Sequence, residues 1–338
     1  MQQYILLKKL RVQNANAIAG LTYGFPAITN FLGFAHALSR KLPANLQITL
    51  GGVAVISHKN DVHARQPKGW GDYVFALTRN PLTQQGKTVP INEEGRMNMQ
   101  LSLLIEVEGL VAGDKTTQQA LVEELTTLIP SLRLAGGQIT EFESCEVLND
   151  EAAQQKALRR LMPGFVLLDR SDYLEAHFLQ LQAKQESASR FDAWCDFSKL
   201  KYQATALKAE QLDDEQSTSI EQDELSINLK ATWAYLAKPN AGYLVPIAAG
   251  YYAISELYSA GDVDKVRDKT VPVTFAETAY SVGEWQSVHR LKEINTGVWR
   301  YTHQFPWYLV KAQSTSLEVV DPDIDESASD DAFDPDFM

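Results

Sequence analysis

Apolar and polar side chains alternate along residues 98–108, and this pattern constrains the fold more than any other feature of the chain. Met99, Leu101, Leu103, Ile105 and Val107 share one face of a strand, because successive strand side chains point to opposite sides. Residues 4–12, 47–57 and 132–147 read as further strands. Helical spacing over residues 26–42 and 114–128 predicts two helices, the first opened by Pro26 and the second capped by Asp114. The order β-α-β-β-α-β predicts an α+β fold with a ferredoxin-like (RRM-type) core over residues 1–150.

Two insertions and a tail are expected around this core. Residues 58–98 are basic and loop-forming, which predicts an inserted arm with a short strand at 73–78. Residues 165–241 contain no glycine and a single proline, so we expect a mainly helical insertion over 151–241. Residues 242–320 are rich in turns and aromatic residues, and they should pack on the core with a closing strand at 299–310.

The net charge of −12 argues, taken alone, against binding to nucleic acid. Eight of the 43 acidic residues lie after residue 320 and none of the 31 basic residues does, so residues 1–320 have a net charge of −4. The acidic segment 321–338 reads as a disordered tail. The remaining sequence is nearly balanced and leaves room for a local basic groove.

The sequence gives no pattern for a metal, a cofactor or a catalytic group. Cys145 and Cys195 are too far apart for a CxxC pair, and the six histidines lack HxxxH or HExxH spacing. No Walker lysine loop or G-x-S-x-G elbow is present. No apolar run approaches the ~20 residues of a membrane helix, and no signal peptide is recognisable, so we expect a cytoplasmic protein without a membrane segment.

Asn14 and Asn16 lie among small residues directly after the first predicted strand. An amide side chain donates and accepts hydrogen bonds, and small neighbours allow a ligand close to the backbone, so a polar ligand could bind at this strand end. The alternative is a turn in which the asparagines cap their own backbone. The residues of this segment leave both interpretations open.

A second candidate is the loop from Arg133 to Gln138, where Gly136 and Gly137 would allow the backbone to approach a phosphate. The alternative is a helix-to-strand turn that needs positive φ. Further bases are Arg79 beside Asn80, Arg96, the Arg159–Arg160 pair, and His289–Arg290 near two tryptophans. Solvated side chains, or tryptophans in the core, would explain these segments equally well.

An ordered series of motifs resembles one family of RNA-binding proteins. The series comprises Gln13-Asn14-Ala15-Asn16, Leu77-Thr78-Arg79-Asn80-Pro81, Glu93-Glu94-Gly95-Arg96, Leu132-Arg133-Leu134-Ala135-Gly136-Gly137, Arg159-Arg160-Leu161-Met162-Pro163-Gly164, Leu244-Val245-Pro246-Ile247 and Gly283-Glu284-Trp285 with His289-Arg290. These blocks run in order across most of the chain. They are similar to the RAMP-superfamily subunit that holds the 5′ handle of the guide RNA in type I-F (Csy) CRISPR surveillance complexes.

The resemblance implies a ferredoxin-like RAMP core and a non-catalytic scaffold, because a different subunit of the family's complex cuts the guide. The implied partners are the guide RNA (crRNA), the large subunit, the adjacent backbone subunit and possibly target DNA. The residues assigned to RNA on this basis are Asn14, Asn16, Arg79, Asn80, Arg96, Arg133, Gly136, Gly137, Gln138, Arg159, Arg160, His289 and Arg290.

Two other functions remain open at this stage. One is a metal-independent RNA endonuclease of the RAMP superfamily, with His36 or His58 as general base. The other is a protein–protein adaptor that makes no RNA contact.

Overall fold

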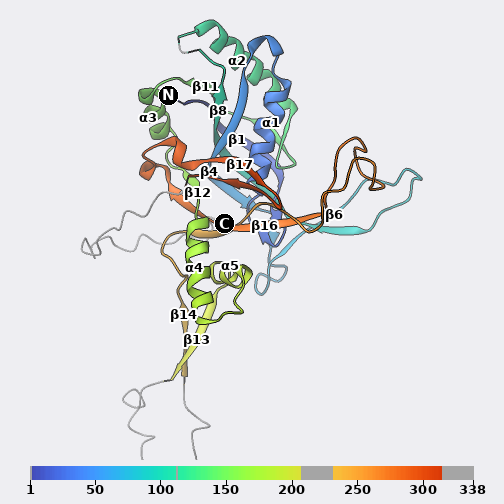
Figure 1. The fold of residues 1–338 in the computed structure, drawn as a ribbon, viewed down its shortest axis with the longest axis vertical. Coiled ribbons are helices and arrows are strands. Elements are labelled where there is room, and N and C mark those ends of the chain that lie inside the picture. Colours follow the sequence, from blue (N-terminus) through green and yellow to red (C-terminus); the bar gives the residue numbers. More distant parts are fainter. Residues whose placement is uncertain (1, 112, 207–230, 314–338) are drawn as a thin grey trace, which may run out of the picture.

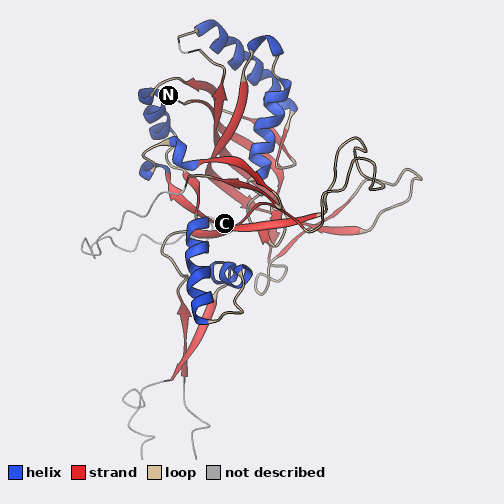
Figure 2. Ribbon diagram, viewed as in Figure 1, coloured by secondary structure: helices blue, strands red, loops and turns tan. Residues whose placement is uncertain are grey.

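The chain folds around one large antiparallel sheet, with helices on both of its faces (Figures 1 and 2). This computed structural model describes residues 2–111, 113–206 and 231–313. The sheet has 11 strands in the order β12-β16-β15-β18-β17-β4-β8-β1-β10-β9, with β11 also paired to β1. The predicted acidic tail, 321–338, lies outside the described residues.

The predicted strands and helices of the first half are present in the expected order. The central strands, β4, β8, β1 and β10, lie side by side in that order and pair antiparallel. The elements of this part are β1 (Gln3–Asn16), α1 (Thr29–Lys41), the 3-10 turn Ala44–Leu46, β4 (Thr49–Val62), β8 (Arg96–Glu108), α2 (Lys115–Leu128), the 3-10 turn Ile129–Ser131, β9 (Arg133–Leu134), β10 (Gly137–Glu141) and β11 (Ser144–Leu148). The predicted fourth strand is therefore split, and β10 and β11 pair with opposite ends of β1.

Of the two predicted helix starts, one agrees with the structure and the other does not. The Asp114 carboxylate accepts a hydrogen bond from the Thr117 backbone N–H at 3.0 Å, which confirms the predicted cap of α2. The prediction that Pro26 occupies the first helical position is wrong, because α1 begins at Thr29. The Ile28 N–H donates to the carbonyl of Ala248 at 3.4 Å, so the chain before α1 docks on the sheet instead of continuing the helix.

The two faces of the sheet are covered by different elements. On one face α1 and α2 contribute Phe31, Leu38, Leu121 and Leu125 to the main core. On the other face Leu6, Ile56 and Leu104 pack against α3 (Glu151–Arg160), β12 (Phe165–Asp169) and the 3-10 turns Val288–Arg290 and Ile294–Gly297. Both faces are therefore buried where these elements lie, unlike a sheet that exposes one whole face.

The region 151–241 contains more sheet than the predicted helical insertion. It has the expected helices α3, α4 (Ser171–Lys184) and α5 (Arg190–Ser198), but also the hairpin β13 (Lys201–Ala206) and β14 (Ala231–Leu236). In addition, β12 pairs with β4 and with β16 (Ala276–Ser287), so the start of this region belongs to the main sheet. The apolar run Val166-Leu167-Leu168 explains this, because such a run is buried most readily inside a sheet. Residues 207–230 lie outside the described part.

The C-terminal strands close a ring on β4. The ring continues from β12 through β16, β15 (Leu244–Ala253), β18 (Trp307–Lys311) and β17 (Val298–Gln304) back to β4. Trp299 is fully buried, and its indole N–H donates to the Leu167 carbonyl across the ring at 3.0 Å. The single closing strand predicted for 299–310 is the hairpin β17–β18, whose turn contains Pro306, a residue that cannot donate to a strand ladder.

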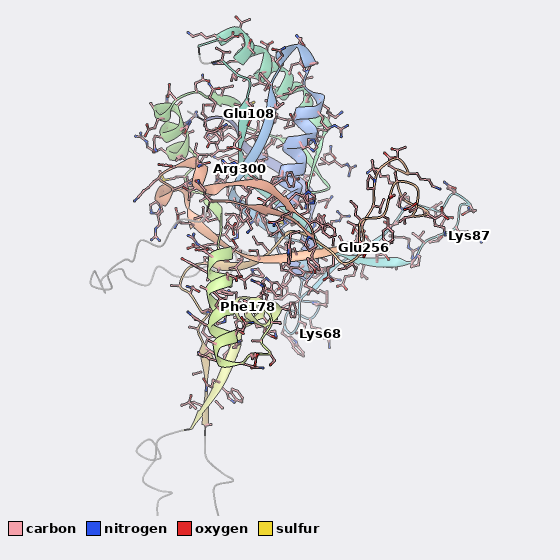
Figure 3. The ribbon with its side chains drawn as sticks, viewed as in Figure 1. Lys68, Lys87, Glu108, Phe178, Glu256 and Arg300 are labelled. Atoms are coloured by element: carbon pink, nitrogen blue, oxygen red, sulfur yellow. The ribbon has the colours of Figure 1, made fainter. Side chains whose placement is uncertain are left out.

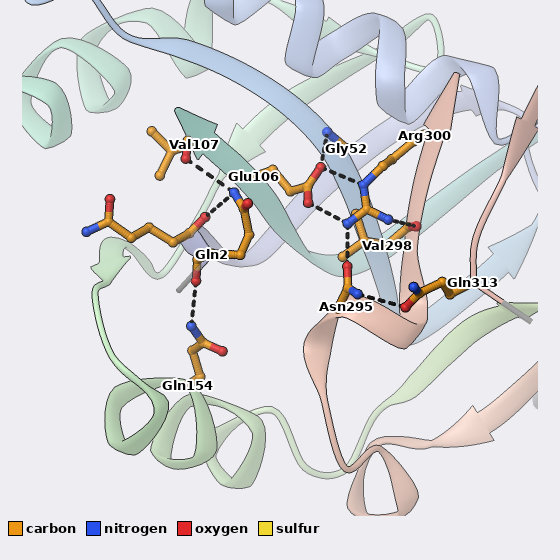
Figure 4. Close-up of polar contacts among 10 residues, drawn as sticks. Gln2, Gly52, Glu106, Val107, Gln154, Asn295, Val298, Arg300 and Gln313 are labelled. Atoms are coloured by element: carbon orange, nitrogen blue, oxygen red, sulfur yellow. Dashed lines mark hydrogen bonds and ion pairs between the residues drawn. The ribbon is translucent and has the colours of Figure 1, made fainter. Parts of the chain in front are cut away.

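A polar network joins β17 to the middle of the sheet (Figure 4). Glu106 on β8 accepts from Arg300 Nε at 2.9 Å and from the Gly52 N–H at 3.0 Å. The Glu106 side chain is only 11% exposed, whereas that of Arg300 is 38% exposed. This pair compensates a carboxylate that would otherwise be buried alone.

The predicted arm projects from the main sheet and contains the strand labelled β6 in Figure 1. Its strands are β5 (Ala64–Arg65), β6 (Val74–Arg79) and β7 (Ile91–Glu94), which form a separate three-stranded sheet. A two-stranded ribbon, β2 (Ile18–Ala19) and β3 (Thr22–Tyr23), follows the end of β1.

Candidate functional site

The sheet face opposite α1 and α2 is polar at the end where the arm begins. Its residues alternate along the strands with buried ones such as Met97 and Met99. They pair across neighbouring strands, with Arg11 opposite Gln100 and Asp61 opposite Asn98. We call this surface the polar strand face, and it comprises Arg11, Gln13, Lys59, Asp61, Arg96, Asn98, Gln100 and Gln138. All eight are exposed or half-buried.

A β-bulge in β1 places Asn14 beside this face. The register of β1 against β8 shifts between Val12 and Ala15, and Asn14 has φ 54°. The Asn14 N–H donates to Asn98 Oδ1 at 3.2 Å, which fixes the bulge to β8. Bulges of this kind commonly redirect side chains at binding sites, and the Asn14 side chain is exposed.

A shallow pocket of about 470 Å³ lies where β1 and β8 meet the arm. It is lined by the ends of β1, β7 and β8, by the first turn of α1 and by the β9–β10 turn. The lining residues are Asn16, Ile18, Asn30, Glu93, Glu94, Gly95, Arg96, Ala135 and Gly136. The pocket thus brings together seven residues from the sequence motifs, of which Asn16, Arg96 and Gly136 were predicted to bind RNA and Glu93, Glu94, Gly95 and Ala135 are their motif neighbours.

The Asn16 side chain closes its own turn, as the alternative interpretation of this segment expected. Its Nδ2 donates to the Ile18 carbonyl at 2.6 Å, and its Oδ1 accepts from the Ile18 N–H at 3.2 Å. An amide has two donors and two acceptor lone pairs, so one of each stays available toward the pocket. Asn16 therefore shapes the pocket and retains part of its capacity to bind a ligand.

The two glycines of the β9–β10 turn have different roles. Gly136 is exposed at the pocket rim with φ 77°, and the neighbouring carbonyl of Ala135 accepts from the Asn16 N–H at 2.8 Å. Gly137 is buried against β1, where a Cβ atom would come within 2.7 Å of the Ala15 nitrogen. Gly137 thus serves strand packing, and Gly136 is the one that can meet a ligand.

The arginines at the site differ in charge balance. Arg96 donates two hydrogen bonds to the Glu94 carboxylate, at 2.8 and 2.9 Å, so its charge is largely compensated. Arg133 is exposed, donates to the Gly136 carbonyl at 3.3 Å, and has no ion pair within the described residues. Arg133 is therefore the base at this pocket that is most available to an anion.

Arg79 and Asn80 lie apart from the polar strand face. Arg79 is the last residue of β6, which pairs with β7, and both residues are exposed. Lys68 and Lys87 also belong to this arm (Figure 3). A backbone hydrogen bond from the His63 N–H to the Arg96 carbonyl, 2.8 Å long, ties the base of the arm to the site.

The four remaining predicted residues lie on the other side of the molecule. Arg159 and Arg160 end α3, and His289 and Arg290 lie in the adjacent turn 288–290, whereas the arm projects from the opposite side (Figure 1). Arg160 pairs at 2.5 Å with Glu146, whose strand partner is Leu6. Leu6 and Asn16 pair with Leu104 and Arg96, which are eight residues apart on β8, or about 26 Å at the usual strand rise. These four residues cannot share one binding pocket with Asn16.

Several residues of the polar strand face were not predicted from the sequence. They are Arg11, Gln13, Lys59, Asp61, Asn98 and Gln100. The alternation that identified β8 contained the signal, because the polar positions between Met97, Met99 and Leu101 form one row.

The two histidines proposed for an endonuclease have different surroundings. One ring nitrogen of His58 lies 2.8 Å from the Pro163 carbonyl and the other 2.8 Å from the fully buried Ser102 hydroxyl. Burial lowers the pKa of His58. His36 is exposed on α1, the helix that packs on the opposite face of the sheet. In the part of the chain that the structure describes, no three His, Cys, Asp or Glu side chains gather as a metal site would require.

Fold and site together define an α+β protein with an antiparallel sheet and a polar site at one sheet end. The family model described as CRISPR-associated protein (Cas_Csy2) matches residues 5–310. The CRISPR-associated protein Csy2 of Pseudomonas aeruginosa (strain UCBPP-PA14) is 36% identical over 317 residues, which are 89% of this chain and 92% of that protein. The chain belongs to the Csy2 family, and the type I-F (Csy) CRISPR family predicted from the motifs is confirmed. No helix among residues 2–111, 113–206 and 231–313 has the length and apolar character needed to cross a membrane.

Proposed function

We propose that this chain is the non-catalytic subunit that holds the 5′ handle of the guide RNA in a type I-F CRISPR surveillance complex. The observation that carries the proposal is the convergence of residues 14–16, 96–100 and 133–138 at the polar end of the sheet. The central order β4–β8–β1–β10, with α1 and α2 on one face, is the arrangement expected of a ferredoxin-like RAMP core.

The chemistry of the site suits unpaired bases held by their edges. Asn14, Asn98 and Gln100 carry amides that donate and accept, as base edges require. Glu93 and Glu94 line the pocket and repel phosphate, so phosphates are expected outside it, near Arg133. We assign base contacts to the pocket and polar strand face, and phosphate contacts to Arg133 and the arm residues Arg79 and Asn80.

Binding of fluorescein-labelled handle RNA by the Asn98→Asp variant tests this assignment. The substitution keeps the Oδ1 that accepts from the Asn14 N–H, but it replaces the amide donor with a negative oxygen. We expect binding to weaken by about tenfold, or about 1.4 kcal/mol, the size of one lost hydrogen bond to a base edge. Asn45→Asp, at an exposed position of the 3-10 turn 44–46, makes the same charge change and should leave affinity unaltered. Equal affinities of both variants and the native chain would contradict the assignment.

The proposed protein partners are the large subunit and the adjacent backbone subunit, within a cytoplasmic complex. Exposed aromatic residues support this, since Tyr202, Trp233 and Tyr235 on the β13–β14 hairpin are 61%, 72% and 50% exposed. Co-expression with the large subunit should convert an aggregating chain into a one-to-one heterodimer, because a partner that binds the folded state stabilises it. A monodisperse monomer that does not associate with the large subunit would contradict the proposed pairing.

Two assays separate this function from its alternatives. Incubation with repeat RNA, with and without a chelator, should leave the RNA intact, whereas cleavage would favour the endonuclease. Crosslinking within the assembled complex should join guide RNA to this chain. Absence of crosslinks at residues 14–16 and 96–100 would favour a protein–protein adaptor.

A further inference from the structure

The pocket between the strand ends and the arm contains two carboxylates, although the ligand proposed for it is an anion. Glu93 and Glu94 are consecutive residues of β7, and both line the pocket. A carboxylate repels the phosphates of RNA, so these residues weaken binding unless they contact another part of the ligand. Base edges supply such a part, because their amino groups donate hydrogen bonds to acidic side chains. The two carboxylates therefore indicate contact with a base.

Arg96 fixes one carboxylate oxygen of Glu94 and leaves the other open. Arg96 Nε and Nη2 both donate to Glu94 Oε2, at 2.9 and 2.8 Å. Glu94 Oε1 accepts no hydrogen bond from the residues that the structure describes. The Glu94 side chain is 28% exposed, so a ligand in the pocket can reach this oxygen. The salt bridge thus holds a negatively charged acceptor in place before any ligand binds.

An unused donor of the same salt bridge lies at the pocket. Arg96 Nη1 makes no hydrogen bond to another described residue, and a Cβ atom added to Gly136 would lie 3.9 Å from it. Gly136 lines the pocket, and so does Ile18, which offers an apolar surface to a planar ring. The volume of about 470 Å³ falls within the range of about 300–1,000 Å³ found for small-molecule pockets. The pocket therefore combines one charged acceptor, one donor and an apolar contact.

Uracil is the RNA base that suits this combination least. Adenine, cytosine and guanine each carry an exocyclic amine beside a ring nitrogen that accepts a hydrogen bond, which matches Glu94 Oε1 beside Arg96 Nη1. Uracil has no exocyclic amine, and its single base N–H lies between two carbonyl groups. A carboxylate that approaches this N–H is repelled by both carbonyl oxygens.

We propose that the Glu94–Arg96 pair makes this pocket selective for a base with an exocyclic amine, so that uracil is rejected. Glu94 Oε1 accepts from the amino group, and Arg96 Nη1 donates to the neighbouring ring nitrogen. The amides of Asn14, Asn98 and Gln100 cannot make this choice alone, because an amide both donates and accepts. The inference rests on the proposed function, since it names the bases that the handle site admits at one position.

Handle RNAs that differ in a single nucleotide test the selectivity. Each position is occupied in turn by cytosine or uracil, two bases of the same shape, and anisotropy of the labelled RNA reports affinity for the full-length chain co-expressed with the large subunit. At one position we expect the native chain to prefer cytosine by about tenfold, the effect of one good base contact. Glu94→Gln should remove this preference and bind the uracil RNA more tightly than the native chain, because the amide nitrogen can donate to a uracil carbonyl. A misfolded variant could not show such a gain.

Glu186→Gln is the matched control, because it removes the same charge at an exposed position between α4 and α5. It should keep the native preference for cytosine. Handle RNA binding without a cytosine preference at any position, or a preference that persists in Glu94→Gln, would overturn the selectivity and leave the handle function intact. If the native chain binds none of the handle RNAs, the handle function fails and the selectivity fails with it.

Discussion

At the scale of single residues, two neighbouring asparagines show how one residue type takes different roles. Asn16 directs its amide to the backbone of Ile18, as an isolated Asn-containing turn does. Asn14 instead sits in a bulge held by Asn98 from another strand, and its own side chain is exposed. The difference arises from the pairing of β1 with β8, which local sequence does not encode.

Arg133→Glu and Arg79→Glu should each weaken guide RNA binding, because each replaces a phosphate-compatible charge with a repulsive one. Arg133 is bonded to Gly136 beside the pocket and Arg79 ends β6 on the arm, so the two losses should be roughly additive. Handle RNA affinity over a salt series measures both effects. Unchanged affinity for both variants would remove the pocket turn and the arm from the RNA-binding surface.

His58 should make folding stability depend on pH. Burial lowers its pKa in the folded chain below the ordinary 6.5, so the unfolded chain takes up the proton first as the pH falls. The free energy of unfolding should therefore decrease as the pH drops below about 6.5, level off below the folded-state pKa, and be insensitive to this group above about pH 7. Urea unfolding of His58→Gln at pH 7.5, 6.5 and 5.5 should show a smaller decrease than the native chain. An equal decrease in the free energy of unfolding for the native chain and for His58→Gln would contradict this origin of the pH dependence.

At the scale of elements, β8 shows why one strand serves both core and site. Residues 101–107 are buried on both faces, whereas Arg96, Asn98 and Gln100 leave one face polar. The change occurs where α3, β12 and the 3-10 turns no longer cover the sheet. A strand of uniform geometry therefore contributes to packing in one half and to binding in the other.

The Glu106–Arg300 pair should hold β17 against the central strands. Arg300→Gln leaves the Glu106 carboxylate with the Gly52 N–H as its remaining close partner, and we expect about 1–2 kcal/mol of destabilisation. The estimate is modest because Arg300 is partly exposed to solvent. Chemical denaturation of the single variant and of Glu106→Gln with Arg300→Gln measures the effect. The double variant should recover part of the loss, and an equal or larger loss would show that the pair is not coupled.

At the scale of the whole molecule, charge is distributed between surfaces more unevenly than the composition suggests. The last described residue, Gln313, accepts a hydrogen bond at 2.8 Å from Asn295 Nδ2, and Asn295 is three residues from the exposed Lys292. The eight acids of residues 321–338 follow this point in the sequence.

Removal of residues 321–338 should leave folding and complex assembly intact, because the segment has too few apolar residues to contribute to a core. Thermal unfolding and co-purification of the complex test this expectation. Loss of the soluble complex would show that the segment has a partner.

The sequence by itself determined the order of strands and helices in the first half of the chain, the position of the arm, and the family. Hydrophobic periodicity and capping are local properties, so α2 with its Asp114 cap and the alternation of β8 could be predicted from neighbouring residues. Motifs in the sequence also identified residues 14–16, 96 and 133–138, which the fold brings together. Splitting of the fourth strand and the hairpin at 304–307 depend on pairing partners far away in the chain.

Only the tertiary structure decided which predicted bases share a site. Arg133 and Arg159 look alike in sequence, but β1 separates them by its length and the sheet places them on different surfaces. The tertiary structure also decided that β12 joins β4 and that α3 covers half of a sheet face, leaving the other half polar and open. The physical reason is that coverage and charge pairing depend on contacts between distant segments, and no local pattern records which segments will meet.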